Sequence, residues 1–259
     1  MDQTLDRSRS TLPLAPPQVR QVALSQPLTW LRLGASDLAR EPGMSLAVGA
    51  VVAAVGVLLL TAGWKATYAA PALLGGFLLV APFFAIAVYR LTRGIESGGE
   101  TLQMRRAWRS NTGSIALFGL ALVLAYIVWE RLAAIVFALF YDGEPLQWSR
   151  LPQELLFSGR YAGLLLTYFV VGALIAAAVF ALSVVTAPLL VDRPIDTVSA
   201  MLTSLRCCRD NPAPMLLWAA LIAALTLVGF ATLMLGLIAI FPWLAHASWH
   251  AYRDLVAPS

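Results

Sequence analysis

The sequence predicts an all-α membrane protein with six transmembrane helices, arranged as three hairpins that are each preceded by a cytoplasmic interfacial helix. Of its 259 residues, 59% are hydrophobic and 12% are charged, whereas soluble domains have about 25% charged residues. The hydrophobic residues also form long runs almost free of ionisable side chains. A bilayer requires about 20 apolar residues per helix, and a helix satisfies its own backbone in hydrocarbon. These runs lie at 44–63, 70–89, 114–129, 162–190 and 213–245.

The N-terminal part of the chain is predicted to stay outside the bilayer. Residues 1–27 are rich in Pro, Ser, Gln and Arg, which is typical of a flexible arm. Residues 28–40 are too short and too charged to span, but their leucines recur at helical spacing and Trp30 suits the headgroup region. We therefore expect an interfacial amphipathic helix there. Because no apolar stretch precedes residue 44, no cleavable signal peptide is expected.

A single membrane domain is predicted over residues 28–255, followed by a short tail at 256–259. The last apolar block, 213–245, is too long for one crossing at about 1.5 Å per residue. We divide it near residues 230–236, and one kinked helix with a re-entrant end is the alternative. The predicted spans are 44–63, 70–89, 114–140, 162–187, 213–231 and 233–252.

The distribution of positive charge predicts the orientation of the chain. With an even number of spans, fourteen of the eighteen Lys and Arg residues lie on one side of the membrane. The positive-inside rule places that side, with both termini, in the cytoplasm. The same arginines suit anionic lipid headgroups. The expected partners are therefore the lipid bilayer and its anionic headgroups, with another membrane protein complex left open and no nucleic acid expected.

A threefold internal repeat is predicted from three similar segments. Each has a short amphipathic stretch, a turn and a membrane hairpin, and each returning span contains a proline, namely Pro82, Pro188 or Pro242. Such repeats are common in membrane folds. We expect the spans to pack as three hairpins, with the prolines bending the returning helices. The amphipathic stretches lie at 30–38, 104–109 and 198–209.

The two histidines, His246 and His250, are weak candidates for a metal site. Being four residues apart, they share one face of a helix, which is the spacing of helical zinc sites and of some haem sites. No HExxH glutamate lies between them, and no other histidine could supply a second haem ligand. Trp243 and Trp249 stand beside them, as at the interfacial end of a helix. A structural role, a metal or haem site, and a role with protons or lipid headgroups all stay open.

Glu130 and Arg131 are the only charges that interrupt an apolar run. An ionisable residue inside a membrane is by default a functional candidate, for example in ion-coupled transport. The alternative is that the two residues, which follow Trp129, mark the outer interface and extend toward water.

Other motifs that would indicate chemistry are missing from the sequence. Cys207 and Cys208 are adjacent, fall on the predicted cytoplasmic side and have no zinc or disulfide spacing, so we expect two small, partly buried residues. The sequence has no phosphate loop, nucleophile elbow, paired catalytic carboxylates or CxxC motif. It therefore predicts neither an enzyme nor a bound cofactor.

Four stretches of the chain form a recognisable set of motifs. They are Trp30-Leu31 with Gly34, Asp37, Pro42 and Ser45-Leu46; Ala200 to Ser204; Asn211-Pro212 with Pro214-Met215; and the tail from His246 to Leu255. In these stretches the chain resembles a family of bacterial predicted integral membrane proteins of unknown function. The resemblance implies a six-span inner-membrane protein of Gram-negative bacteria without an established activity. Some members are labelled as respiratory oxidases, but this chain lacks the several histidines that an oxidase needs for haems and copper.

The leading functional hypothesis is a non-enzymatic inner-membrane protein that organises, assembles or associates with other membrane components. Two alternatives stay open. One is a small-molecule or lipid transporter or channel, suggested by the repeat and the prolines. The other is a haem- or metal-linked respiratory accessory protein, which depends on His246 and His250.

Overall fold

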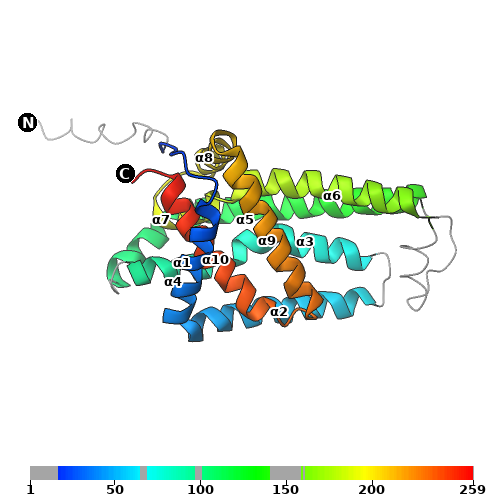
Figure 1. Cartoon of the computed structure of the whole chain (residues 1–259), viewed down its shortest axis with the longest axis horizontal. Coiled ribbons are helices and arrows are strands. Elements are labelled where there is room, and N and C mark those ends of the chain that lie inside the picture. Colours follow the sequence, from blue (N-terminus) through cyan, green and yellow to red (C-terminus); the bar gives the residue numbers. More distant parts are fainter. Residues whose placement is uncertain (1–16, 65–68, 97–100, 141–158, 160, 259) are drawn as a thin grey trace, which may run out of the picture.

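A computed structural model of the chain describes residues 17–64, 69–96, 101–140, 159 and 161–258. In this part of the chain the regular elements are all α-helices, which confirms the predicted all-α class (Figure 1). The helices are α1 (Gln26–Arg40), α2 (Pro42–Trp64), α3 (Ala69–Phe84), α4 (Ile86–Glu96), α5 (Thr101–Phe140), α6 (Ala162–Ser183), α7 (Thr186–Asp192), α8 (Thr197–Asp210), α9 (Pro212–Ala231) and α10 (Leu237–Leu255).

Four helical segments of the described residues are long and apolar enough to cross a membrane. The prediction of six spans is not confirmed beyond these four. The predicted span 70–89 is divided between α3, which has only 16 residues, and α4. The predicted span 233–252 corresponds to α10, whose second half holds His, Tyr and Arg residues that lower its hydrophobicity. The four segments are Pro42–Thr61, Asn111–Phe140, Ala162–Asp192 and Pro212–Ala231.

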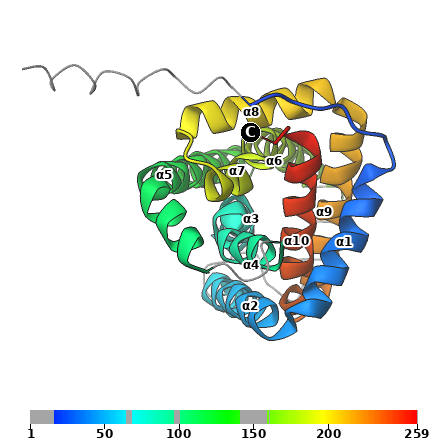
Figure 2. The ribbon, with the colours of Figure 1, turned by 90° about the vertical axis from the view of Figure 1, so that its left-hand side faces the viewer.

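The helices run in two main directions. In Figure 1, α2, α3, α6 and most of α5 follow the long axis of the molecule. Figure 2, a view along that axis, shows α2, α3 and α6 end-on and α1, α8, α9 and α10 from the side. Helix α2 packs against α3, α5 against α6 and α9 against α10, but α10 packs most extensively against α1 and α2.

Prolines decide where several helices begin. Helix α2 begins at Pro42 and α9 at Pro212, the position where a missing N–H costs no helical hydrogen bond. Residues 111–114, between the predicted stretch 104–109 and the third span, are expected to form the turn of the second repeat, but they hold no proline and α5 continues through them. The predicted middle interfacial helix, 104–109, is therefore part of α5. The apolar block 213–245 is divided by a turn at 232–236, as predicted.

The three prolines of the predicted returning spans affect their helices differently. A turn at Ala85 separates α3 from α4, three residues after Pro82. Pro188 lacks the N–H that would bond Val184, and the break between α6 and α7 falls there. Helix α10 is continuous through Pro242, so the predicted bending is not uniform.

Both ends of the described chain lie at the same end of the molecule. Val19 and Val256 form an antiparallel bridge. The backbone N–H of Arg20 donates to the carbonyl of Leu255 at 2.8 Å, and the N–H of Ala257 donates to the carbonyl of Gln18 at 3.0 Å. Most of the predicted arm, residues 1–16, lies outside the described residues, but its last part is paired with the tail. Any membrane crossed between these two ends must be crossed an even number of times.

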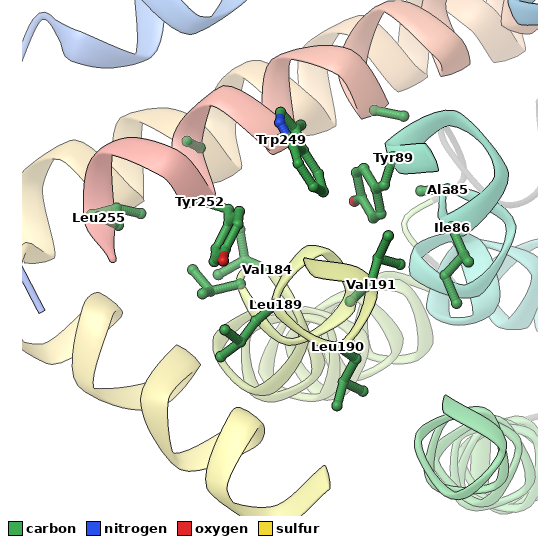
Figure 3. Packing of buried hydrophobic residues seen from close by; sticks show 14 of the residues in the cluster. Ala85, Ile86, Tyr89, Val184, Leu189, Leu190, Val191, Trp249, Tyr252 and Leu255 are labelled. Carbon is green, nitrogen blue, oxygen red and sulfur yellow. The ribbon is translucent and has the colours of Figure 1, made fainter. Parts of the chain in front are cut away.

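The largest buried cluster lies at the end that holds the termini. There Tyr89 of α4, Leu189 and Val191 of α7, and Trp249 and Tyr252 of α10 belong to one apolar core (Figure 3). The membrane-length helices instead expose apolar side chains on their outer faces, which is expected of surfaces that contact lipid. Examples are Leu58, Leu120, Leu166, Leu174, Leu216 and Leu227.

Two glycines allow α10 to approach its neighbours. A Cβ on Gly34 of α1 would lie 2.6 Å from the backbone nitrogen of Ala247, and a Cβ on Gly49 of α2 would overlap the carbonyl oxygen of Ile238. That carbonyl has no helical donor because the residue four positions later is Pro242. The bare Cα of Gly49 can therefore lie directly against it.

We predict that Gly34→Ala and Gly49→Ala each lower the free energy of unfolding by about 1–3 kcal/mol, because the added methyl group meets backbone atoms. Thermal unfolding in a mild detergent would measure the loss. Gly113→Ala is the matched control, since a Cβ at Gly113 meets nothing within 4 Å. Equal stability of the three variants would contradict the close packing of α10.

Candidate functional site: the polar hub of helix α10

The predicted site residues His246 and His250 lie in the second half of α10, which is packed against α1, α2, α4 and α7. Polar side chains of this half-helix bond to residues of the surrounding helices. We call these side chains and their partners the polar hub. Its members on α10 are His246, His250, Tyr252, Arg253 and Asp254, and their partners are Gln26, Trp30, Asp37, Ser45, Thr92, Glu96 and Asp192.

His246 is fully buried and uses both ring nitrogens. Its Nε2 lies 2.9 Å from Oγ of Ser45, and its Nδ1 lies 2.6 Å from Oγ1 of Thr92. The Thr92 hydroxyl donates to the carbonyl of Val88 at 3.1 Å. Its oxygen must then accept from Nδ1–H of His246, which assigns Nε2 as the acceptor for the Ser45 hydroxyl. The imidazole thus joins α2, α4 and α10, and no ring lone pair is left for a metal.

His250 has a different partner. Its Nε2 lies 2.7 Å from Oδ2 of Asp37, a buried carboxylate of α1 whose other oxygen is 3.6 Å from Nη1 of Arg40. The two histidines therefore share a helix face, as predicted, but they bind separate groups. Within the described ranges, no cluster of three or more His, Cys, Asp or Glu side chains could hold a metal ion.

The hub contains a serine, a histidine and an aspartate but not a catalytic triad. A triad needs the carboxylate on the histidine that contacts the serine. Here Asp37 bonds His250, while Ser45 bonds His246. Ser45 and His246 are also completely buried, so a substrate could not reach the hydroxyl.

Asp192 of α7 is the second centre of the hub. The hydroxyl of Tyr252 donates to its Oδ2 at 2.6 Å. Three guanidinium groups surround the same carboxylate: Nε of Arg93 at 3.4 Å, Nε of Arg193 at 3.7 Å and Nη1 of Arg253 at 3.7 Å. One acceptor thus links the ends of α4, α7 and α10, which also contact one another through their apolar residues.

Asp254 connects α10 to the start of α1. Its Oδ2 accepts hydrogen bonds from Nε2 of Gln26 and from Nε1 of Trp30, both at 2.7 Å. Trp30 is fully buried and meets Trp218 of α9 edge to face, with ring centroids 5.6 Å apart. Sequence reasoning missed these partners. The available signal was the series of polar residues in the tail, but it does not identify partners two hundred residues away.

Glu130 and Arg131 lie outside the hub. Oε2 of Glu130 is 2.9 Å from Nε of Arg131, and the Arg131 side chain is 75% exposed on the outer surface of α5. Glu130 lies 19 residues after Asn111, which is about 28 Å along a helix. Since the hydrocarbon layer is about 30 Å thick, the pair falls where a span that begins near Asn111 would leave it.

Helix α8 is amphipathic in an unusual sense, because small residues face the protein and larger apolar residues face outward. Thr197, Ala200, Thr203, Ser204 and Cys207 are buried. The outward residues are Val198, Leu202 and Leu205, followed by the exposed Arg206 and Arg209.

The cysteines of α8 are free thiols. Burial raises the pKa of the Cys207 thiol to about 12 and that of Cys208 to about 11. Both therefore stay protonated near neutral pH, whereas metal binding and nucleophilic attack require the thiolate. This agrees with the expectation of two small, partly buried residues.

Together these features define the chain as a helical membrane protein whose conspicuous polar residues bind one another. The comparison with protein families agrees, since residues 69–192 match the family described as "Predicted integral membrane protein (DUF2189)". The resemblance to a family of predicted integral membrane proteins of unknown function is thereby confirmed over this segment. The stretches that first indicated it lie on either side of the match. No curated protein and no solved structure matches the chain.

We predict that Ser45→Ala and Thr92→Val each lower the free energy of unfolding by about 1–3 kcal/mol, because either change leaves a buried nitrogen of His246 without a partner. Denaturation followed by tryptophan fluorescence would report the loss. Thr61→Val is the matched control, since Thr61 is exposed and bonds only within its own helix, to Leu58. Unchanged stability of both hub variants would show that His246 does not depend on these hydroxyls.

For Cys207 we expect negligible alkylation by N-ethylmaleimide at pH 8 in the folded protein, because the reactive thiolate becomes abundant only near pH 12. Unfolding in SDS should make the reaction fast, and mass spectrometry of the peptide would quantify both states. Rapid labelling of the folded protein would contradict the buried position.

Proposed function

We propose that the protein is a non-enzymatic bacterial inner-membrane protein that organises or associates with other membrane components. The observation that best supports this is the polar hub. The side chains most suited to chemistry are bonded to other helices: His246 is fully buried and His250 partly buried. The exposed side chains include many apolar residues on the long helices and the arginines of α8, Arg206 and Arg209. Such surfaces suit association with lipid and with other membrane proteins.

The proposed topology has six membrane-inserted helical segments in three hairpins, α2–α3, α5–α6 and α9–α10, with both termini in the cytoplasm. The pairing of Val19 with Val256 supports an even number of crossings. Asn211, at the start of α9, also bonds the N-terminal segment: its Oδ1 accepts from Val22 N–H at 2.9 Å, and its Nδ2 donates to Arg20 at 3.1 Å. The positive-inside rule favours the cytoplasm for this arginine-rich end.

The outward face of α8 supports contact with an anionic lipid surface. Val198, Leu202 and Leu205 are exposed on one side of the helix. Arg206 and Arg209 lie in its last turns. An amphipathic helix of this kind buries its apolar side at the acyl boundary and places its cations among headgroups.

Neither alternative function gains support from the site geometry. A haem or metal accessory needs histidine nitrogens, but Ser45 and Thr92 occupy both nitrogens of His246. An ion-coupled transporter needs acidic groups along an internal path, but Glu130 pairs with Arg131 on the outer surface of α5.

Extraction in a mild detergent, followed by analysis of co-purifying proteins, lipids and metals, would test the proposal. We expect partner proteins or anionic lipid to co-purify, and Arg206→Gln with Arg209→Gln to lower the bound anionic lipid at least twofold. Arg131→Gln is the matched control, since it removes an exposed arginine elsewhere.

Two results would overturn the proposal. One is a Soret band or stoichiometric metal that disappears in His246→Ala or His250→Ala. The other is solute flux in proteoliposomes that is lost in Glu130→Gln.

A further inference from the structure

The turn between α9 and α10 has a composition that does not suit water. It reads Thr-Leu-Met-Leu-Gly over 232–236 and has no charged residue. Residues 65–68 start with a lysine, and 141–160 contain Asp, Glu and Arg residues. Turns in water favour Gly, Asn, Asp, Ser and Pro. In this turn Leu233 and Met234 have positive φ angles of 51° and 71°, a conformation that such side chains rarely adopt.

The N–H groups of this turn need no water. Each N–H from Thr232 to Ala239 donates to an oxygen atom of residues 228–236, at distances of 2.8 to 3.2 Å. The Thr232 hydroxyl takes part by accepting from the N–H of Gly236 at 2.8 Å and donating to the carbonyl of Gly229 at 2.8 Å. An unsatisfied N–H group in hydrocarbon costs several kcal/mol, so the pairing of all these donors suits a turn inside the bilayer.

The turn also stops short of the far end of α2. Met234 is buried in a cluster with Val52 and Phe77 and packs against Gly56 of α2. Helix α2 continues for eight more residues to Trp64, which is about 12 Å further along the bundle. Figures 1 and 2 show the reason: α9 and α10 run obliquely to α2 and α3. A helix of the same length therefore reaches less far along the long axis of the bundle.

We infer that the α9–α10 hairpin is re-entrant: it enters from the side that holds the termini and turns inside the hydrocarbon layer. The side chains of Leu233 and Leu235, 71% and 64% exposed, then contact lipid acyl chains. Helix α9 is long enough to cross, but it runs obliquely to the other membrane helices. Full crossings are left to α2, α5, α6 and the segment formed by α3 with the start of α4, which keeps their number even. The inference rests on the membrane insertion proposed above but not on which side is the cytoplasm.

Cysteine labelling and spin labelling would test the position of the turn. Leu233→Cys and Leu235→Cys would be made singly in a chain with Cys207→Ala and Cys208→Ala. An impermeant maleimide should label neither position, in spheroplasts or in inverted vesicles, until SDS is added. A nitroxide on the same cysteines should be relaxed more strongly by oxygen than by a water-soluble nickel complex.

Two controls make the result specific. Ser36→Cys, on the exposed face of α1, should be labelled from the side of the termini, and Glu144→Cys, in the polar segment 141–160, from the opposite side. Labelling of Leu233→Cys from the Glu144 side, or stronger relaxation by nickel than by oxygen, would overturn the re-entrant hairpin. An exchange of sides between the two controls would instead contradict only the proposed orientation.

Discussion

The fold depends on hydrogen bonds that α10 makes to helices on every side of it. A polar half-helix in an apolar interior is stable only when each buried donor and acceptor has a partner. The exception on this half-helix is Nε1 of Trp249, which is buried and has no acceptor among the described residues. Here the partners come from four other helices: Ser45 of α2 and Thr92 of α4 for His246, Asp37 of α1 for His250, and Asp192 of α7 for Tyr252. These bonds have direction, so they fix how the helices are arranged, whereas apolar contacts between lipid-facing helices leave more freedom.

Helix α10 connects the re-entrant turn at its start to the polar hub at its end, so the positions of the two depend on each other. Pro242 frees the carbonyl of Ile238, which lets Gly49 of α2 lie against it. This contact fixes the start of α10 about a third of the way along α2, and the hub fixes its end beside the termini. A helix held at both points has to run obliquely, so the turn before it lies inside the hydrocarbon layer. The N–H groups of this turn must then find acceptors within the protein.

Much of the fold could be predicted because its signals are local. Long apolar runs give the helical class and the approximate limits of α2, α6 and α9, and the division of 213–245 follows from length alone. The apolar pattern does not reveal that α3 ends just after Pro82 or that α5, which has no proline at 111–114, continues through the predicted start of a span. Likewise, four-residue spacing identified His246 and His250, but the same spacing serves a metal site and a pair of hydrogen bonds. Only the facing hydroxyls and Asp37 decide between them.

The pairing of the first described residues with the last has a consequence for biosynthesis. A ribosome delivers α1 and α2 long before α10, yet the side-chain hydrogen bonds of Trp30, Asp37 and Ser45 are made to α10. Until α10 emerges, the early helices can insert but cannot reach their final packing. Folding of the whole domain therefore waits until α10 has left the ribosome, and a nascent chain that stops before α10 leaves these polar groups without partners, where quality-control proteases can recognise them.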